Sequence, residues 1–193
     1  MAPGGYVWIF NKSADSANVG IGVNLGMVKN PGDVKRYLDG FIASQPRLAK
    51  GQNVETVAGA VSVGMPLECV TADGLMLVGD AARMIDPLTG GGVSNACIAG
   101  QVAAKVAKDA HDAGDFSKEF FQTYETGWRA KIEDQLFRNY VAKEKLLELT
   151  DDTINKIIDA LQGYKIERIT TADILRMVQE RYPEIMNELQ DLL

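Results

Sequence analysis

One run of this chain carries more information than any other, and it reads Leu75-Met76-Leu77-Val78-Gly79-Asp80-Ala81-Ala82. Its apolar residues have the length of a strand, and turn residues bound them on both sides. The pattern predicts a buried strand with Asp80 at its carboxyl end, where open sheets present their ligand groups. Pro87 and the triplet Gly90-Gly91-Gly92 follow, and they predict a tight turn that opens onto a helix.

These features together predict a ligand site. Glycines let backbone N–H groups approach a ligand closely, and the following helix directs its positive dipole end at the same place. A carboxylate beside that helix end favours a cofactor that carries a polyol and can hold negative charge. The plainer interpretation makes Asp80 a helix cap or turn residue and the glycines a flexible loop.

The bulk composition limits the classes of function. The chain has 193 residues, of which 46% are hydrophobic and 24% charged, as in globular proteins. Its net charge of −6 argues against a nucleic-acid partner, because phosphate binding needs clustered lysine and arginine. Cys69, Cys97 and His111 lack metal-ligand spacing, so we expect neither a metal site nor a disulfide framework. Without a signal peptide or a membrane-spanning run, a cytoplasmic protein is expected, with peripheral membrane contact left open.

The first part of the chain is predicted to be sheet. Tyr6-Val7-Trp8-Ile9-Phe10 is rich in aromatic and β-branched residues. From Asn18 to Leu25, apolar residues alternate strictly with small or polar ones. We interpret the two runs as a hairpin with one apolar face and one open face floored by Gly20 and Gly22.

Further elements follow along the chain. A short helix is expected to begin at Pro31 and Asp33 and to end near Gln45, and residues 54–63 are predicted as a strand. Residues 93–110 and 116–149 read as two helices, with the join to an all-helical region near Gly114. On the second helix an apolar, mostly aromatic stripe recurs every four residues and is expected to be core: Phe116, Phe120, Tyr124, Trp128, Ile132, Leu136 and Tyr140.

The end of the chain is predicted to form two or three shorter amphipathic helices. Thr170 and Asp173 resemble a capping box, and Pro183 suits the first turn of a last short helix. A lipid-facing groove or a partner interface along the stripe of the long helix is the less favoured alternative.

Two motifs carry a resemblance to a known family. The run from Gly79 to Gly92, with its Asp-Pro-Leu-Thr-Gly-Gly-Gly ending, resembles the second flavin motif of FAD-dependent oxidoreductases of the aromatic-hydroxylase fold. It is most similar to the geranylgeranyl reductase branch, which includes the archaeal digeranylgeranylglycerophospholipid reductases. Residues 5–12 and the Gly20-x-Gly22 strand are similar to that branch's Tyr-x-Trp-x-Phe-Pro-Lys segment and its following strand, except that Asn11 replaces the usual proline.

The resemblance implies a fold and a domain organisation. The fold class would be α+β, as part of an FAD/NAD(P)-binding, aromatic-hydroxylase-like architecture. Residues 1–66 would belong to an antiparallel substrate-binding sheet, and residues 67–113 to the C-terminal part of the FAD-binding domain. Residues 114–193 would form a helical C-terminal region.

The resemblance also implies a cofactor site. FAD would be held by Gly79, Asp80, Pro87, Gly90, Gly91, Gly92 and Val93. The Asp80 carboxylate would accept hydrogen bonds from the ribityl chain. Backbone N–H groups from about Gly90 to Val93 would face the N1–C2=O edge of the flavin, where negative charge gathers on reduction.

A substrate site is implied on the hairpin. The face carrying Tyr6, Trp8 and Phe10 would border an isoprenoid tunnel, with Gly20 and Gly22 leaving room for the prenyl chain. Ordinary core is an equal alternative for the aromatic residues. A bulge or a close helix contact is the alternative for the glycines.

The implied function is a reductase that saturates double bonds of geranylgeranyl chains in archaeal-type lipids. Its partners would be the prenyl lipid and an electron donor, either NAD(P)H or a ferredoxin-like protein. Gly20, Gly22 and Gly26 lack the Gly-x-Gly-x-x-Gly spacing that grips FAD pyrophosphate, so we expect a separate N-terminal nucleotide-binding segment and an inactive isolated chain. An aromatic-hydroxylase-like monooxygenase and a non-catalytic prenyl-lipid-binding fragment are the alternatives.

The proton donor is not identified by any sequence context. Cys97 is expected to be a small packing residue, and His111 to occupy a solvated helix end. Asp86 suits a turn as well as a functional role. For Arg83 a surface position is favoured over contact with a lipid phosphate.

Overall fold

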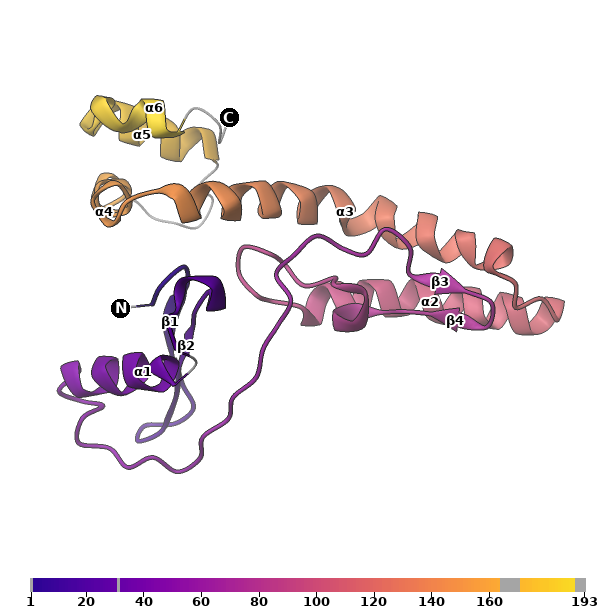
Figure 1. Cartoon of the computed structure of the whole chain (residues 1–193), viewed down its shortest axis with the longest axis horizontal. Coiled ribbons are helices and arrows are strands. Elements are labelled where there is room, and N and C mark those ends of the chain that lie inside the picture. Colours follow the sequence, from indigo (N-terminus) through magenta and orange to yellow (C-terminus); the bar gives the residue numbers. More distant parts are fainter. Residues whose placement is uncertain (1, 31, 164–170, 190–193) are drawn as a thin grey trace. The chain divides into compact units, whose positions relative to one another are not determined.

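The computed structural model describes residues 2–30, 32–163 and 171–189 (Figure 1). The chain divides into two compact units, Met1–Ala58 and Gly59–Leu193, which are described separately here as unit 1 and unit 2. The mixture of helices with small antiparallel sheets confirms the α+β class. The flavin-fold architecture stays a prediction.

Unit 1 contains the predicted hairpin and the predicted short helix. Strands β1 (Tyr6–Asn11) and β2 (Ala17–Gly22) pair antiparallel, and α1 runs over Asp33–Ser44. Strand β2 ends before Leu25, because the Asn24 side chain accepts a hydrogen bond from Gly26 N and begins the 3-10 turn η1 (Leu25–Met27). Pro31, expected at the start of α1, lies outside the described residues.

The pairing register explains one of the two hairpin glycines. Trp8 lies opposite Gly20, and its indole fills the space above that glycine. A Cβ at Gly20 would sit 2.1 Å from Trp8 Cζ2, whereas at Gly22 the nearest indole atom would be 3.9 Å away. The room expected for a prenyl chain at Gly20 is therefore occupied by the chain's own tryptophan.

The strand predicted over residues 54–63 is wrong for the described structure, which has neither helix nor strand there. Val54 and Val57 are 97% and 83% exposed. A strand needs backbone partners for its N–H and C=O groups, and no backbone–backbone hydrogen bond to residues 54–63 is present among the described residues.

The strand predicted at Leu75 to Val78 is also shorter and more exposed than expected. Strands β3 (Thr71–Ala72) and β4 (Leu75–Met76) form a two-residue antiparallel ladder, and Leu75 is 48% exposed. One further backbone bond joins Leu77 N to Val70 O at 2.8 Å. The 3-10 turn η2 (Gly79–Ala82) follows, because Gly79 has a φ of 63° and so leaves the extended conformation.

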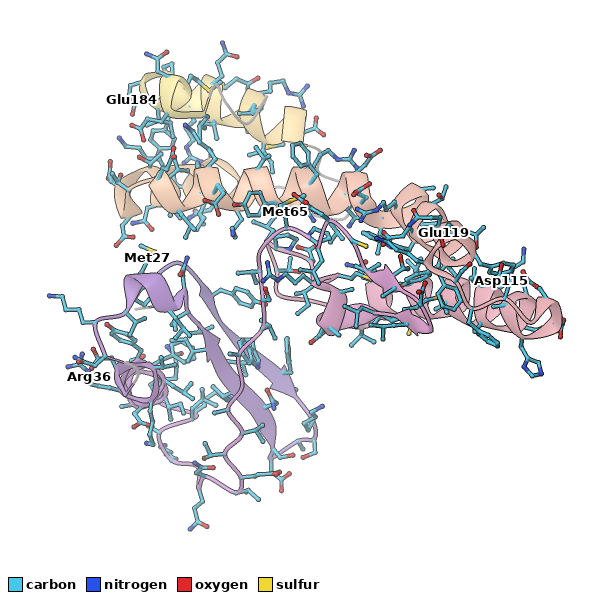
Figure 2. All side chains as sticks on the ribbon, turned by 45° about the vertical axis from the view of Figure 1, so that its right-hand side comes forward. Met27, Arg36, Met65, Asp115, Glu119 and Glu184 are labelled. Carbon is cyan, nitrogen blue, oxygen red and sulfur yellow. The ribbon has the colours of Figure 1, made fainter. Side chains whose placement is uncertain are left out.

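The predicted helices are present. Helix α2 covers Val93–Ala113 and ends at Gly114, which has a φ of 67°. Helix α3 covers Lys118–Glu148 and begins where the Ser117 hydroxyl accepts a hydrogen bond from Phe120 N. Asp115 and Glu119 mark the junction of the two helices (Figure 2).

Shorter helices complete the chain. They are α4 (Asp151–Ala160), α5 (Thr171–Arg181), the 3-10 turn η4 (Pro183–Ile185) and α6 (Met186–Leu189). They enclose a small core of Ala160, Leu175, Val178, Ile185 and Leu189. Thr170, expected in a capping box, lies outside the described residues.

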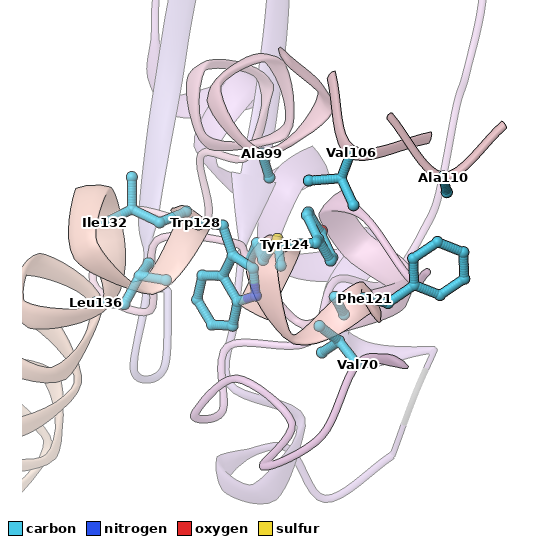
Figure 3. Close-up of a cluster of buried hydrophobic side chains, with 11 residues drawn as sticks. Val70, Ala99, Val106, Ala110, Phe121, Tyr124, Trp128, Ile132 and Leu136 are labelled. Atoms are coloured by element: carbon cyan, nitrogen blue, oxygen red, sulfur yellow. The ribbon is translucent and has the colours of Figure 1, made fainter. Parts of the chain in front are cut away.

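The core of unit 2 lies between α2 and α3 (Figure 3). It confirms that the stripe on α3 is packed inside: Tyr124, Trp128, Ile132 and Leu136 are buried, while Phe116 at its start is 49% exposed. The two helices approach closely at Gly127, where a Cβ would sit 2.6 Å from Val102 Cγ1. Across the described ranges, each helix is too short or too polar to cross a bilayer.

Candidate functional site

A cavity of about 450 Å³ opens at the N-terminus of α2, within unit 2. Four of the predicted cofactor residues line it: Asp80, Gly90, Gly92 and Val93. The other lining residues are Val61, Ile85, Ala96 and Cys97. The run around Asp80 and the glycine triplet thus meet at one place, as the sequence predicted.

Asp80 lies directly beside the first turn of α2. A Cβ built on Gly92 would be 3.1 Å from Asp80 Oδ1 and 3.3 Å from Ile85 Cγ1, so a side chain at Gly92 would press on both. Asp80 itself is exposed and available to a ligand. Gly79, with a φ of 63°, brings η2 so close to α2 that a Cβ there would be 3.2 Å from Ala96 Cβ.

Asp86 organises the loop that carries the three glycines. Its Oδ1 accepts hydrogen bonds from Leu88 N at 2.9 Å and Thr89 N at 3.0 Å. Its backbone exchanges bonds with Gly90 and Gly91 at 2.9 and 2.8 Å. Asp86 is therefore a turn residue. Pro87, in the same loop, is buried and does not line the cavity.

A second cavity of about 440 Å³ lies on the other side of the same loop. Gly91 faces this one rather than the first, together with Ser94 and Asn95 of α2. Lys131 and Gln135 of α3 line the opposite wall.

Two side chains of helix α3 that the sequence reasoning missed hold segments next to residues that line the first cavity. Asn139 Nδ2 donates to Asp86 Oδ2 at 2.6 Å, and Lys143 Nζ donates to the Val63 carbonyl at 3.0 Å. The two residues are one helical turn apart, so they project from the same face of α3. One of them fixes the glycine loop, and the other fixes the segment that carries Val61.

Tyr124 holds the segment that leads to Asp80. Its buried hydroxyl donates to the Leu77 carbonyl at 2.7 Å. Burial, assisted by the nearby Glu125 charge, raises the pKa of Tyr124 to about 12, so the hydroxyl stays a donor at neutral pH. The stripe pattern identified Tyr124 as core but gave no signal for this bond.

Glu125 and Arg129 tie residues 67–71 to α3. The buried Glu125 carboxylate accepts from Val70 N at 2.6 Å and from Arg129 at 2.9 Å. Arg129 also donates to the Glu68 carbonyl at 2.8 Å, and its guanidinium lies 4.4 Å above the Trp128 ring. The i, i+4 spacing of Glu125 and Arg129 gave a signal for an ion pair, but not for its burial or its distant partners.

The predicted substrate residues lie in unit 1. Tyr6, Trp8 and Phe10 share one face of β1, with ring centroids 5.9 and 6.2 Å apart in succession. Tyr6 and Phe10 are at least half exposed, and Trp8 Nε1 donates to Asn18 Oδ1 at 2.7 Å. The alternative interpretation, in which these aromatic side chains are ordinary core residues, is therefore wrong for Tyr6 and Phe10 within unit 1, because both are exposed there.

Three further candidates have clear positions. Cys97 is exposed and lines the first cavity, so the expectation of a packing residue is wrong. His111 is exposed in the last turn of α2, as expected. Arg83 is exposed and adopts a left-handed conformation, with a φ of 55°, at the end of η2.

Comparison with known proteins agrees with the resemblance. Residues 1–61 match the geranylgeranyl reductase catalytic domain. Over its full length the chain is 45% identical to a protein of Thermoplasma acidophilum, and 39% identical to one of Methanoculleus marisnigri, both named digeranylgeranylglycerophospholipid reductase. It spans about half of these relatives, 49% and 48% of their lengths.

A solved structure gives the same result for the fold. A geranylgeranyl bacteriochlorophyll reductase-like protein of Thermoplasma acidophilum is 45% identical to the chain, with a TM-score of 0.87. The match covers 100% of this chain and 48% of that one.

Proposed function

The chain belongs to the geranylgeranyl reductase family, and on that premise we propose that it is part of an FAD-dependent reductase that saturates double bonds in the geranylgeranyl chains of isoprenoid lipids. The observation that carries the proposal is the cavity in which an exposed carboxylate, Asp80, stands beside the side-chain-free start of α2 at Gly92. Carboxylate and helix N-terminus suit the two polar parts of a flavin, its ribityl hydroxyls and its pyrimidine edge.

The residues present fit the cofactor chemically. Gly92 lines the cavity and carries no side chain, so a ligand in the cavity could approach the backbone at the start of α2. A helix N-terminus stabilises nearby negative charge by about 0.3–1 kcal/mol when exposed, and more when partly buried. Bound FAD would supply the hydride, and we propose NAD(P)H or a ferredoxin-like protein as the source of its electrons. The chain's own contribution would be to hold the ribityl chain at Asp80 and to favour the reduced, anionic flavin.

The lipid-facing role is proposed for the aromatic face of β1. Tyr6, Trp8 and Phe10 present apolar rings without charged groups between them, which suits a chain of isoprene units. We accordingly propose residues 1–66 as the substrate-binding portion, 67–113 as part of the FAD-binding domain and 114–193 as a helical region. A cytoplasmic protein in peripheral contact with a membrane is consistent with such a substrate.

Flavin binding is tested by titrating FAD into the purified chain and following quenching of flavin fluorescence. The titration is run with the chain alone and with the half of the Thermoplasma acidophilum relative that lies outside the match. We expect Asp80→Ala to weaken FAD binding by about 10- to 100-fold, because a charged hydrogen bond contributes roughly 1.5–3 kcal/mol. Asp109→Asn, an exposed carboxylate on α2, is the matched control and should change nothing.

Two outcomes decide against the flavin site. The first is absence of FAD binding under both conditions. The second is equal affinity of Asp80→Ala and the unaltered chain.

The substrate class is tested on the chain assembled with that same half, supplied with FAD and a chemical reductant. Mass spectrometry of geranylgeranylated lipid should show stepwise gain of hydrogen pairs. Hydroxylation of a small aromatic compound instead would favour the monooxygenase alternative.

A further inference from the structure

The second cavity lies where the start of α2 runs beside α3, and it encloses about 440 Å³. That volume falls within the usual range for small-molecule sites, roughly 300–1,000 Å³. Ile98 and Ile132 form the less exposed part of its lining. Ser94, Lys131 and Gln135 are exposed, so the polar side chains lie nearer to solvent. A ligand in this cavity would meet apolar surface on one side and hydrogen-bonding groups on the other.

The two charged side chains of this lining differ in how far their bonding capacity is used. Asp86 Oδ1 accepts two N–H groups of the glycine loop, and Asp86 Oδ2 accepts from Asn139 at 2.6 Å. Lys131, by contrast, forms no ion pair with any carboxylate that the structure describes. An ammonium group carries three donors, so the charge with free bonding capacity is positive. The cavity therefore favours an anionic ligand.

Neutral polar groups around Lys131 are also unused within the described ranges. The Ser94 hydroxyl and the Gln135 amide have no hydrogen-bond partner there. Asn95 donates from Nδ2 to the Met84 carbonyl at 3.0 Å, which fixes the amide and leaves its Oδ1 as an acceptor. Donors suit anionic oxygens, and amide oxygens suit hydroxyl groups. This combination fits a phosphate that carries a hydroxylated substituent.

The second cavity is separate from the one proposed for flavin, although the two share a wall. Gly92 and Val93 line both cavities. Asp80 lines only the first, and Lys131 lines only the second. A ligand beside Lys131 would therefore add to the proposed flavin site rather than form part of it.

We propose that the second cavity binds a phosphate ester, with its phosphate group paired to Lys131 and its hydroxyl groups bonded to Asn95 and Gln135. A lysine ammonium recognises phosphate as a point charge, and the first-turn N–H groups of α2 add donors at the same wall. Phosphate esters come from two sources, a phospholipid headgroup and a soluble nucleotide such as NADPH. The proposed function makes both relevant, and the inference rests on that function only for the choice between them.

The test is titration calorimetry on the purified chain, with no FAD present. Glycerol phosphate represents the headgroup and NADP⁺ the nucleotide, while glycerol is the uncharged control. We expect at least one phosphate ester to bind, glycerol not to bind, and binding of the ester to weaken as ionic strength rises. Tighter binding of glycerol phosphate assigns the cavity to a headgroup, and tighter binding of NADP⁺ assigns it to a nucleotide.

A lysine variant tests the place of binding. Lys131→Met removes the charge and should weaken binding of the ester by about 10- to 100-fold, because a hydrogen bond to a charged group is lost. Lys105→Met is the matched control, since Lys105 is an exposed lysine of α2 that lies outside the cavity and has no ion pair to a described carboxylate. Both lysines are exposed, so helical circular dichroism should be unchanged in either variant.

Three results would overturn the proposal. One is that neither ester binds. Another is that Lys131→Met and Lys105→Met bind the ester equally well. The third is that glycerol binds as tightly as glycerol phosphate, which would mean that charge plays no part in recognition. Because no FAD is present, none of these outcomes bears on whether the cavity at Asp80 binds flavin.

Discussion

The two tryptophans of the chain show how differently its two units are built. Trp128 in unit 2 is completely buried between α2 and α3, in contact with the rest of the main core. Trp8 in unit 1 is only half-buried and rests on a hairpin with no enclosed core among its described residues. Unit 2 is therefore held together by a continuous buried core, whereas the described residues of unit 1 rely on hairpin pairing and on half-exposed contacts.

This difference is tested most strongly by truncating each tryptophan in turn. Trp128→Ala should cost about 3–5 kcal/mol, because it removes the largest buried side chain and leaves a cavity. Trp8→Ala should change the unfolding of unit 2 by less than about 0.5 kcal/mol. Urea denaturation followed by helical circular dichroism measures both. Similar losses in the two variants would mean that the units do not differ as proposed.

Tyr124 gives the next largest effect, and it concerns pH. Its pKa is raised by burial to about 12 in the folded chain, while an unfolded tyrosine titrates near 10. The folded state therefore keeps the Tyr124 proton to a higher pH than the unfolded state does. The contribution of the neutral hydroxyl to the free energy of unfolding is fully present below about pH 10. It is lost as pH rises from about 10 to 12, amounting to roughly 2–3 kcal/mol.

Tyr124→Phe isolates this effect. The variant lacks the ionisable hydroxyl, so its stability should fall less steeply than that of the unaltered chain between pH 10 and 12. At neutral pH it should be about 1 kcal/mol less stable, because the bond to the Leu77 carbonyl is gone. Parallel denaturation curves at each pH make the comparison, and equal slopes with pH would contradict it.

The same contrast explains which sequence predictions succeeded. The repeat on α3 is local information, so the helix and its buried face followed from spacing alone. The strands predicted at 54–63 and 75–78 depended on neighbouring strands. In the described chain, residues 54–63 have no strand partner, and residues 75–78 pair only with the two residues of β3. A strand pattern specifies a surface that can pair, but not the neighbour that pairs with it.

The candidate site divides in a similar way. Asp80 and Gly92 are close in sequence, and their meeting at α2 followed from the strand, turn and helix pattern. Asn139 and Lys143 act across 53 and 80 residues of sequence, on partners that only the packing of α3 brings near. Polar residues on an exposed-looking helix face carried no signal of that role.

Within unit 1, the hairpin itself is tested by Gly20→Ala. The new methyl group would lie 2.1 Å from the Trp8 ring, so the indole must move away from its position over residue 20. This displacement should lower the stability of the hairpin by about 1–3 kcal/mol. Trp8 fluorescence, recorded in a Trp128→Phe background, should become more accessible to acrylamide. Gly22→Ala has 3.9 Å of room and is the matched control. Equal quenching in the two variants would show that Trp8 does not sit over Gly20.

The smallest expected effect lies in the more stable unit and concerns the glycine loop. Asn139→Ala removes the bond to Asp86 Oδ2 while leaving the α2–α3 core intact, so the loss of stability should be about 1 kcal/mol. Because Asp86 shapes the turn from Leu88 to Gly91, the loop amides should exchange faster in the variant. Arg138→Ala, on the neighbouring exposed position, should leave both quantities unchanged. If Asn139→Ala lowers stability without altering exchange in residues 86–92, then Asn139 supports α3 packing rather than the wall of the cavity.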